Sequence, residues 1–264
     1  MTAADPARIP EQRLERLPGY PYSTTYLARE GGPRLAYLAE GPSDGHPVLL
    51  LHAPPAWSYL WRQVVPMLTE AGCRAVAPDL LGCGRSDGPG AAALTLGDHV
   101  ESIAALVDHL DLHDVTLVAH GAAAPLAWRL LARERYSRLV AIEPHAAPAA
   151  PPADLAPSEQ IARGCTGALS PSTRSAYDAP FADGAPVATT LADAEADELP
   201  PIDKPLLVVT GAVESRAAAA WTEGSPGVAA SRRHLIVPAA GHYVPEDRGP
   251  ELALGILAFL IEKG

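Results

Sequence analysis

The feature that most constrains the fold of this chain is an apolar run that ends at a corner of small residues, over residues 115–126 (VTLVAHGAAAPL). The run indicates a buried strand, and the apolar spacing after it indicates a helix. A strand, a sharp turn and a helix in this order form a nucleophile elbow, in which small residues flank a central catalytic residue. Here the flanking residues are Ala119 and Ala123, and the central residue is Gly121.

Gly121 has no side chain, so the position where covalent catalysis needs a Ser, Cys or Asp is vacant. The central residue of such an elbow adopts a positive φ, which glycine reaches without steric cost. We therefore predict that the turn keeps its backbone conformation and that the covalent chemistry is lost.

Length and composition indicate a globular protein and oppose a nucleic-acid-binding function. The chain has 264 residues, enough for one large domain, and 48% of them are hydrophobic. A net charge of −11 without a long basic cluster opposes nucleic-acid binding. The longest apolar runs are too short to cross a membrane, and residues 1–16 lack the apolar core of a secretory signal. We expect a cytoplasmic location.

The cysteines are typical of a reduced intracellular protein, because their number is odd and their spacing does not match a metal site. They are Cys73, Cys83 and Cys165. The sequence therefore indicates neither a metal nor a cofactor.

Apolar runs alternate with helical spacing along most of the chain, which predicts an α/β fold with a mostly parallel central sheet and helices on both faces. A hairpin is expected over residues 24–40. The expected buried strands are residues 48–51, 73–77, 115–119, 139–142, 205–210 and 234–237, and the expected helices are residues 58–71, 96–110, 124–133 and 250–261.

Apolar periodicity weakens over residues 145–200, where Pro, Ala and Asp are dense. We interpret this segment as a small lid inserted into a core domain formed by residues 1–144 and 201–264.

Five segments, in the same order along the chain, resemble the haloalkane dehalogenases, a branch of the α/β-hydrolase fold. They are residues 17–21 (LPGYP), 52–62 (HAPPAWSYLWR), 78–87 (PDLLGCGRSD), 175–181 (SAYDAPF) and 241–247 (GHYVPED). The resemblance starts near residue 14 and implies an α/β-hydrolase fold with a lid shorter than is usual in the family.

The resemblance also shows where this chain departs from the family. Gly121 stands for the Asp nucleophile, and Ala122 for a halide-binding Trp. Pro54 stands for the second halide contact, which also gives the oxyanion hole a backbone N–H that proline lacks. The Ala122 N–H remains as the expected oxyanion donor. Neither dehalogenation by the family mechanism nor ordinary ester hydrolysis is expected, since losing one such donor alone costs about 10²–10³ in rate.

The catalytic base is expected to remain. His242 follows the last strand, where the fold places its histidine. Glu214, after the strand at 205–210, and Glu143, after the strand at 139–142, are alternative acids that would fix the tautomer of His242. Such a pair moves protons without a nucleophile, which contributes about 10²–10⁴ in rate.

The remaining aromatic and histidine residues divide between pocket and core. Trp57 and Phe181 are expected to line an apolar pocket near Ala53 and Pro54, and Tyr243 to donate a hydrogen bond to a substrate oxygen. Those expected to be structural are His52, His120 and Trp61, while His145 is either a second proton donor or an exposed lid residue.

The preferred hypothesis is an enzyme that performs His-dependent acid–base chemistry on an apolar small molecule: cyclisation, elimination, isomerisation, or opening of an epoxide or lactone. Bacterial natural-product biosynthesis is the expected setting. One alternative is a hydrolase whose water is activated directly by His242, and another is a non-catalytic binder. The sequence indicates no membrane partner and is compatible with a homodimer.

Overall fold

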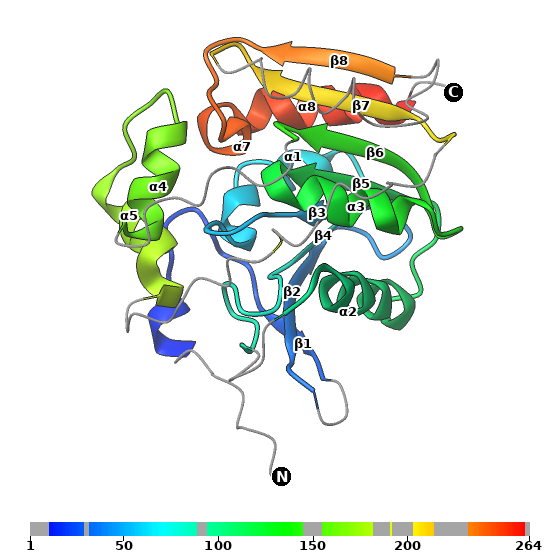
Figure 1. Cartoon of the computed structure of the whole chain (residues 1–264), viewed down its shortest axis with the longest axis horizontal. Coiled ribbons are helices and arrows are strands. Elements are labelled where there is room, and N and C mark those ends of the chain that lie inside the picture. The colour runs from blue at the N-terminus through cyan, green and yellow to red at the C-terminus, as the bar shows by residue number, and fades with distance from the viewer. Residues whose placement is uncertain are drawn as a thin grey trace.

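The computed structural model describes residues 11–28, 32–88, 94–144, 155–181, 191, 203–213 and 232–261. These residues form an eight-stranded sheet in the order β1-β2-β4-β3-β5-β6-β7-β8 (Figure 1). The strands are β1 (Thr25–Leu27), β2 (Leu35–Glu40), β3 (Pro47–Leu51), β4 (Arg74–Pro78), β5 (Val115–His120), β6 (Tyr136–Ile142), β7 (Leu206–Gly211) and β8 (Arg232–Val237).

The pairing of the strands confirms the predicted fold class. β2 pairs antiparallel with β1 and with β4, and all other neighbours pair parallel. Every residue of β5 and of β7 is buried, as expected where helices cover both faces of a parallel sheet.

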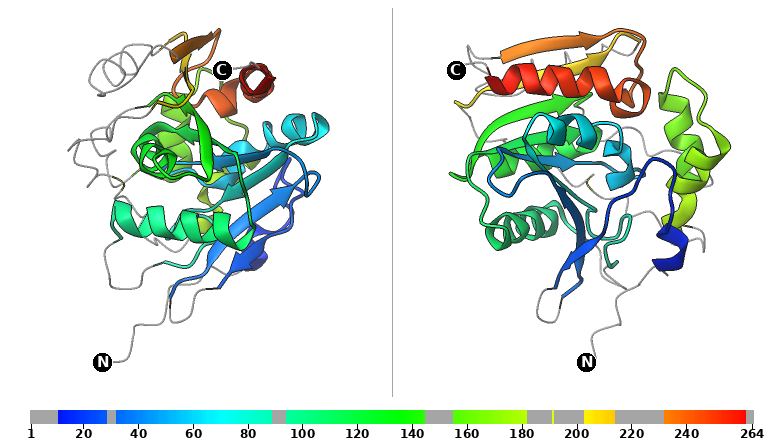
Figure 2. Two further views of the ribbon diagram at one scale, coloured as in Figure 1. Left: turned by 90° about the vertical axis from the view of Figure 1, so that its right-hand side faces the viewer. Right: turned by 180° about the vertical axis from the view of Figure 1, so that it is seen from behind.

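Two separate cores lie on the two faces, because side chains of a strand alternate between faces. Leu49 and Leu51 of β3 belong to the core that α2 and α3 cover, whereas Val48 and Leu50 belong to the core that η2, α1 and α8 cover (Figure 2). The helices are η1 (Glu11–Leu14), η2 (Ser58–Trp61), α1 (Val65–Glu70), α2 (Leu96–His109), η3 (Gly121–Ala123), α3 (Ala124–Leu131), α4 (Pro157–Gly164), α5 (Pro171–Asp178), η4 (Ala179–Phe181), α7 (Val244–Asp247) and α8 (Gly249–Ile261).

The helix predicted over residues 58–71 is wrong as a single element. The structure divides it into the short 3₁₀ helix η2 and the α-helix α1. Pro66 stands in the first turn of α1, where its missing N–H costs nothing. Within a continuous helix its ring would clash with the preceding turn, so the helical spacing of the sequence spans two elements.

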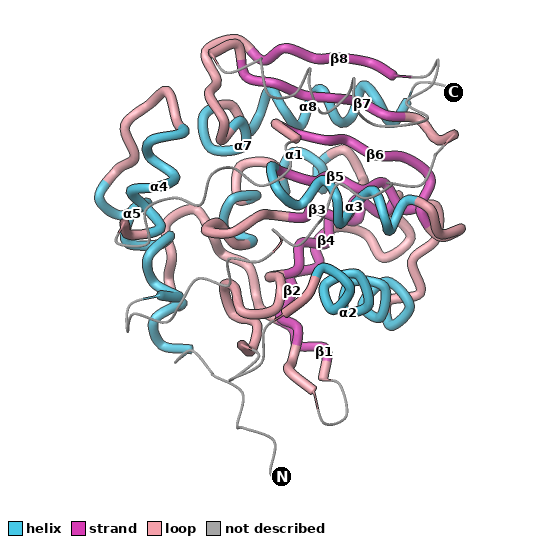
Figure 3. Tube along the Cα trace, in the orientation of Figure 1, coloured by secondary structure: helices cyan, strands magenta, loops and turns pink. Residues whose placement is uncertain are grey.

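The described part of the expected lid consists of α4, α5 and η4. The parallel strands end on the side of the molecule where α4 and α5 lie, and loops connect the elements there (Figure 3). The expected lid boundaries, at residues 145 and 200, lie outside the described residues. Within the described part of the chain, no helix is long and apolar enough to cross a membrane.

Two buried histidines make stability depend on pH. Burial lowers the pKa of His52 to about 3 and that of His99 to about 4, from an ordinary value of 6.5. As the pH falls below 6.5 the unfolded chain binds protons first, so the stability is fully present above pH 6.5 and is lost toward the folded-state values.

We expect the free energy of unfolding to fall by up to about 1.4 kcal/mol per pH unit for each histidine. Urea unfolding of the wild type and of His99→Leu between pH 7 and pH 4 measures this dependence. The His99→Leu variant should show a shallower decrease, and equal slopes for the two proteins would contradict the assignment.

Candidate active site

Parallel pairing brings the loops that follow the central strands to one edge of the sheet. Leu51 pairs with Ala119, and His120 pairs with Ile142, so β3, β5 and β6 end side by side. β7 and β8 continue the sheet in the same direction. In open α/β sheets, ligands bind outside the carboxyl ends of the strands. This edge is therefore the place where candidate residues can meet.

Gly121 forms the turn between β5 and α3. Its φ is +57°, which confirms the predicted backbone conformation, and it is buried. Ala119 and Ala123, the small flanking residues, are fully buried, and α3 packs against β5. The side chain of Ala122 is half-buried against the core on the α3 face. The turn therefore presents backbone groups and a methyl group at the strand edge.

His242 lies in the loop between β8 and α7 and is half-buried. The Nε2–H of His120 donates a hydrogen bond to the His242 carbonyl oxygen, at 2.9 Å. The rings of His120 and His242 are 4.8 Å apart, and the buried Tyr243 ring stacks on His120 at 5.0 Å. Three aromatic rings therefore form one cluster at the end of β5.

His120 is buried, as expected of a structural histidine, and it lies against the candidate residue His242. It stands two residues after Val118, whose side chain belongs to the same core as Tyr243. Because strand side chains alternate, this spacing places His120 on the face that carries the His242 loop. The alternation along β5 was the signal that could have placed His120 on this face of the sheet.

Glu143, one of the two alternative acids, ends β6 with a φ of +44° and is only 2% exposed. Its Oε1 accepts a hydrogen bond from the Gly211 N–H at 2.6 Å, and its own N–H donates to the Val209 carbonyl. The carboxylate is therefore anchored at the end of β7. Glu214 lies outside the described residues, as does His145.

The loop after β3 holds the other predicted residues. His52 is fully buried and accepts a hydrogen bond at Nε2 from the Leu80 N–H, 2.9 Å away, which gives it the expected structural role. Ala53 is buried and Pro54 is half-buried.

Trp57 belongs to the core that η2, α1 and α8 cover. It is fully buried and stacks on Tyr59, with ring centroids 5.5 Å apart. Trp61 is fully buried too, as expected, and Phe181 ends η4 at 8% exposure. Burial excludes Cys83 as a nucleophile, because it raises the pKa of the thiol well above its usual range.

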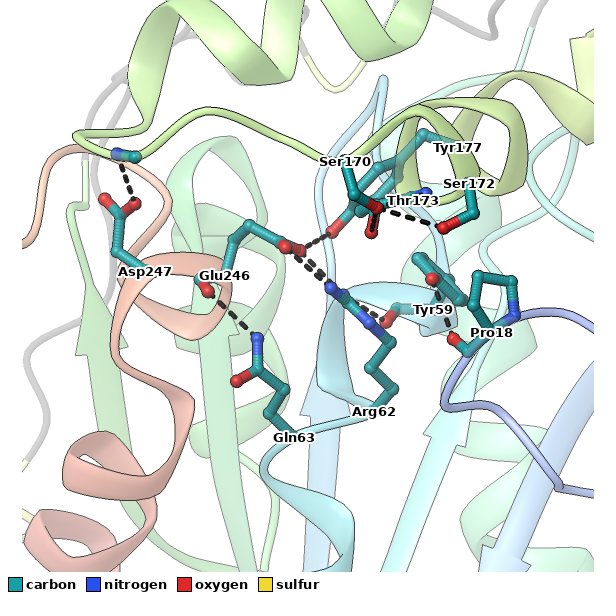
Figure 4. A network of polar contacts seen from close by, with 11 residues as sticks. Pro18, Tyr59, Arg62, Gln63, Ser170, Ser172, Thr173, Tyr177, Glu246 and Asp247 are labelled. Atoms are coloured by element: carbon teal, nitrogen blue, oxygen red, sulfur yellow. Dashed lines mark hydrogen bonds and ion pairs between the residues drawn. The ribbon is translucent and has the colours of Figure 1, made fainter.

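A buried ion pair that the sequence did not predict joins this region together (Figure 4). The Arg62 guanidinium donates to both oxygens of Glu246, each at 2.6 Å, and the Tyr177 hydroxyl donates to Oε2, also at 2.6 Å. The two charged side chains are only 10% and 7% exposed. Burial, and then the neighbouring Glu246 charge, raise the pKa of Tyr177 well above its usual value, so it remains a donor.

Among the residues that the structure describes, no group of three His, Cys, Asp or Glu side chains is placed to hold a metal ion.

The sheet order, the strand–turn–helix at Gly121 and the histidine loop after β8 define an α/β-hydrolase fold, and the alpha/beta hydrolase fold family model matches residues 46–163. A haloalkane dehalogenase of Mycolicibacterium paratuberculosis is 35% identical over 96% of this chain and 97% of its own. Haloalkane dehalogenase 1 of Mycobacterium tuberculosis is 33% identical over 97% of this chain and 98% of its own.

The tetrameric haloalkane dehalogenase DpaA from Paraglaciecola agarilytica has a similar structure, with a TM-score of 0.82 and 28% identity over 96% of this chain and 98% of that one. The chain belongs to this family of α/β-hydrolase-fold enzymes and is related to the haloalkane dehalogenases.

The contribution of the buried ion pair between Arg62 and Glu246 to stability can be tested by substitution. Glu246→Gln leaves the buried Arg62 without its counter-charge, so we expect the free energy of unfolding to fall by about 3 kcal/mol. The matched control is Glu159→Gln, which removes an exposed pair with Arg163 one helical turn away and should change it by less than about 0.5 kcal/mol. Urea unfolding at pH 7 compares them, and equal losses would contradict the buried role.

Proposed function

We propose that this protein is an α/β-hydrolase-fold enzyme without an elbow nucleophile, which uses His242 for acid–base chemistry on an apolar small molecule. The observation that carries the proposal is the turn at Gly121. It has the positive φ of a nucleophile-bearing residue, 57°, but no side chain. A covalent intermediate on a side chain at this position is therefore impossible, and the proposed reaction proceeds without one there.

The relatives are named haloalkane dehalogenases, but this chain lacks what their reaction needs. Their mechanism requires a side chain that attacks the carbon bearing the halogen, together with two halide contacts. Gly121, Ala122 and Pro54 replace these groups, and proline also has no N–H to offer. In a serine protease where it has been measured, loss of the nucleophile alone reduces kcat by about 10⁶.

The surroundings of His242 support its use as an acid or base. A general base must lie within hydrogen-bond reach of the proton that it moves, so its backbone has to be held in place. His120 fixes the His242 carbonyl, and the Glu246 ion pair anchors α7 immediately after it. Glu143 or Glu214 would orient the imidazole. A chain that had merely lost its function would not be expected to keep so many groups around this histidine.

The small residues at the turn also support a class of substrate. Gly121 and Ala122 lack the carboxylate and the indole ring that the haloalkane dehalogenases carry at these positions. The smaller side chains would leave space for a bulkier apolar molecule at the place of the nucleophile. The lid at residues 145–200 would cover it. Cyclisation, elimination, isomerisation and the opening of an epoxide or lactone can each proceed by proton transfer without a covalent enzyme intermediate, and natural-product biosynthesis is the setting we propose.

Restoring the carboxylate tests the account of the missing groups. We expect Gly121→Asp to release no substantial halide from 1-chloro- and 1-bromoalkanes, because Ala122 and Pro54 still provide no halide contacts. Halide release by wild type and variant is measured on samples whose urea unfolding confirms that both are folded. Rapid release by the variant would show that the losses at Ala122 and Pro54 are unimportant.

A deletion of the gene in the source organism tests the role of His242. We expect wild type and His113→Ala, an exposed histidine 67% accessible, to restore the missing metabolite, and His242→Ala to lower its formation at least about 10²-fold. A product with the formula of the accumulated compound would indicate isomerisation or cyclisation, and one with added water would favour the hydrolase. Equal restoration by His242→Ala would exclude acid–base chemistry and favour a binding protein.

A further inference from the structure

The loop that carries His242 is bound to the lid by hydrogen bonds on both sides of the histidine. The Tyr243 N–H donates to the Gly164 carbonyl at the end of α4, at 3.2 Å. On the other side, the Thr166 hydroxyl donates to the Ala239 carbonyl, at 2.9 Å. These residues are separated by more than 70 positions in the sequence, so the fold alone brings them together.

The end of α4 and the loop that carries His242 approach so closely that only glycine fits where their backbones cross. A Cβ on Gly241 would lie 2.5 Å from the Gly164 carbonyl oxygen. A Cβ on Gly164 would lie 2.8 Å from the Tyr243 ring and 3.2 Å from the Cβ of His242. The end of α4 is therefore packed directly against the backbone of the histidine.

The Asp247 carboxylate accepts hydrogen bonds from both of these segments, the His242 loop and the turn after α4. The Asp247 Oδ2 accepts the Gly241 N–H at 2.9 Å, and both of its oxygens accept the Thr166 N–H at 3.0 Å. Its Oδ1 also lies 3.3 Å from the Gly167 N–H. Figure 4 shows the Asp247 carboxylate turned toward the lid backbone. A carboxylate suits this place because it offers two acceptor oxygens and makes charge-assisted hydrogen bonds.

We infer that Asp247 is a positioning residue that couples the lid to His242. The residue before His242 and the turn after α4 share its carboxylate, so neither can move relative to the other without breaking a hydrogen bond to Asp247. A second link runs parallel to it, because Glu246 binds Tyr177 of α5. The end of the lid near His242 therefore stays fixed, and the position of the lid determines the position of the histidine. For catalysis, the inference rests on the proposed role of His242.

The experiment compares Asp247→Asn with Asp178→Asn, a matched change within the lid. Asp178 also accepts two hydrogen bonds, from the N–H and the hydroxyl of Ser158, but both partners belong to the lid. Amide hydrogen exchange reports on Thr166 and Gly241, and the imidazole NMR signal, assigned with His242→Ala, reports on His242.

In Asp247→Asn we expect exchange at Thr166 and Gly241 to accelerate together by at least about tenfold, and the His242 signal to shift or broaden. Asp178→Asn should leave all three unchanged. Should Asp247→Asn fail to fold, Thr166→Val removes only the hydroxyl contact to Ala239 and should displace the His242 signal by a smaller amount.

Faster exchange at Thr166 with an unchanged His242 signal in Asp247→Asn, or an unchanged His242 signal in Thr166→Val, would overturn the coupling. Unchanged exchange at Thr166 and Gly241 together with an unchanged His242 signal in Asp247→Asn would overturn it too. The measurements need no substrate, so they stand apart from the complementation with His242→Ala, whose failure would overturn the proposed function while leaving the coupling intact.

Discussion

The buried ion pair between Arg62 and Glu246 is the interaction on which the site region depends. It joins the residue after η2 to α7 and, through Tyr177, to α5, so three segments that are far apart in the sequence share one charged group. Two charges so far from water are favourable only when each is hydrogen-bonded by the other or by a polar neighbour. The pair therefore specifies one relative placement of three segments that apolar packing alone would leave adjustable.

Most of the fold could be predicted from the sequence, because its causes are local. Continuous apolar runs such as Val48 to Leu51 are typical of strands covered on both faces, and the structure confirms them as β3 and its neighbours. The wrong prediction of a single helix over residues 58–71 also has a local cause. Pro66 lies in the first turn of a new helix, although the apolar spacing of the sequence continues unbroken there. α4 and α5 gave a weak signal because each is eight residues long, and packing on neighbours stabilises helices of that length more than their own sequence does.

Less of the candidate site could be predicted. The φ of Gly121 followed from its residue type, because glycine suits a turn that other residues adopt at a cost. The partners of Glu246 and Asp247 did not follow, since they lie from 6 to 184 positions away in the chain and the meeting points depend on the completed sheet. For His120, strand alternation predicts the face of the sheet on which the side chain lies, but it does not predict that His242 is its neighbour.

The left-handed turn at Gly121 also constrains how this protein can evolve. Among residues with a side chain, Asn and Asp tolerate this conformation best, so a single substitution could place a carboxylate at the turn at small cost in backbone strain. A backbone amide donor at position 54 needs a separate change, because an amide hydrogen is present there only when the proline ring is replaced. Descendants of this chain can thus gain an acidic group at the turn by one substitution, whereas an acidic group together with an amide donor at position 54 requires two.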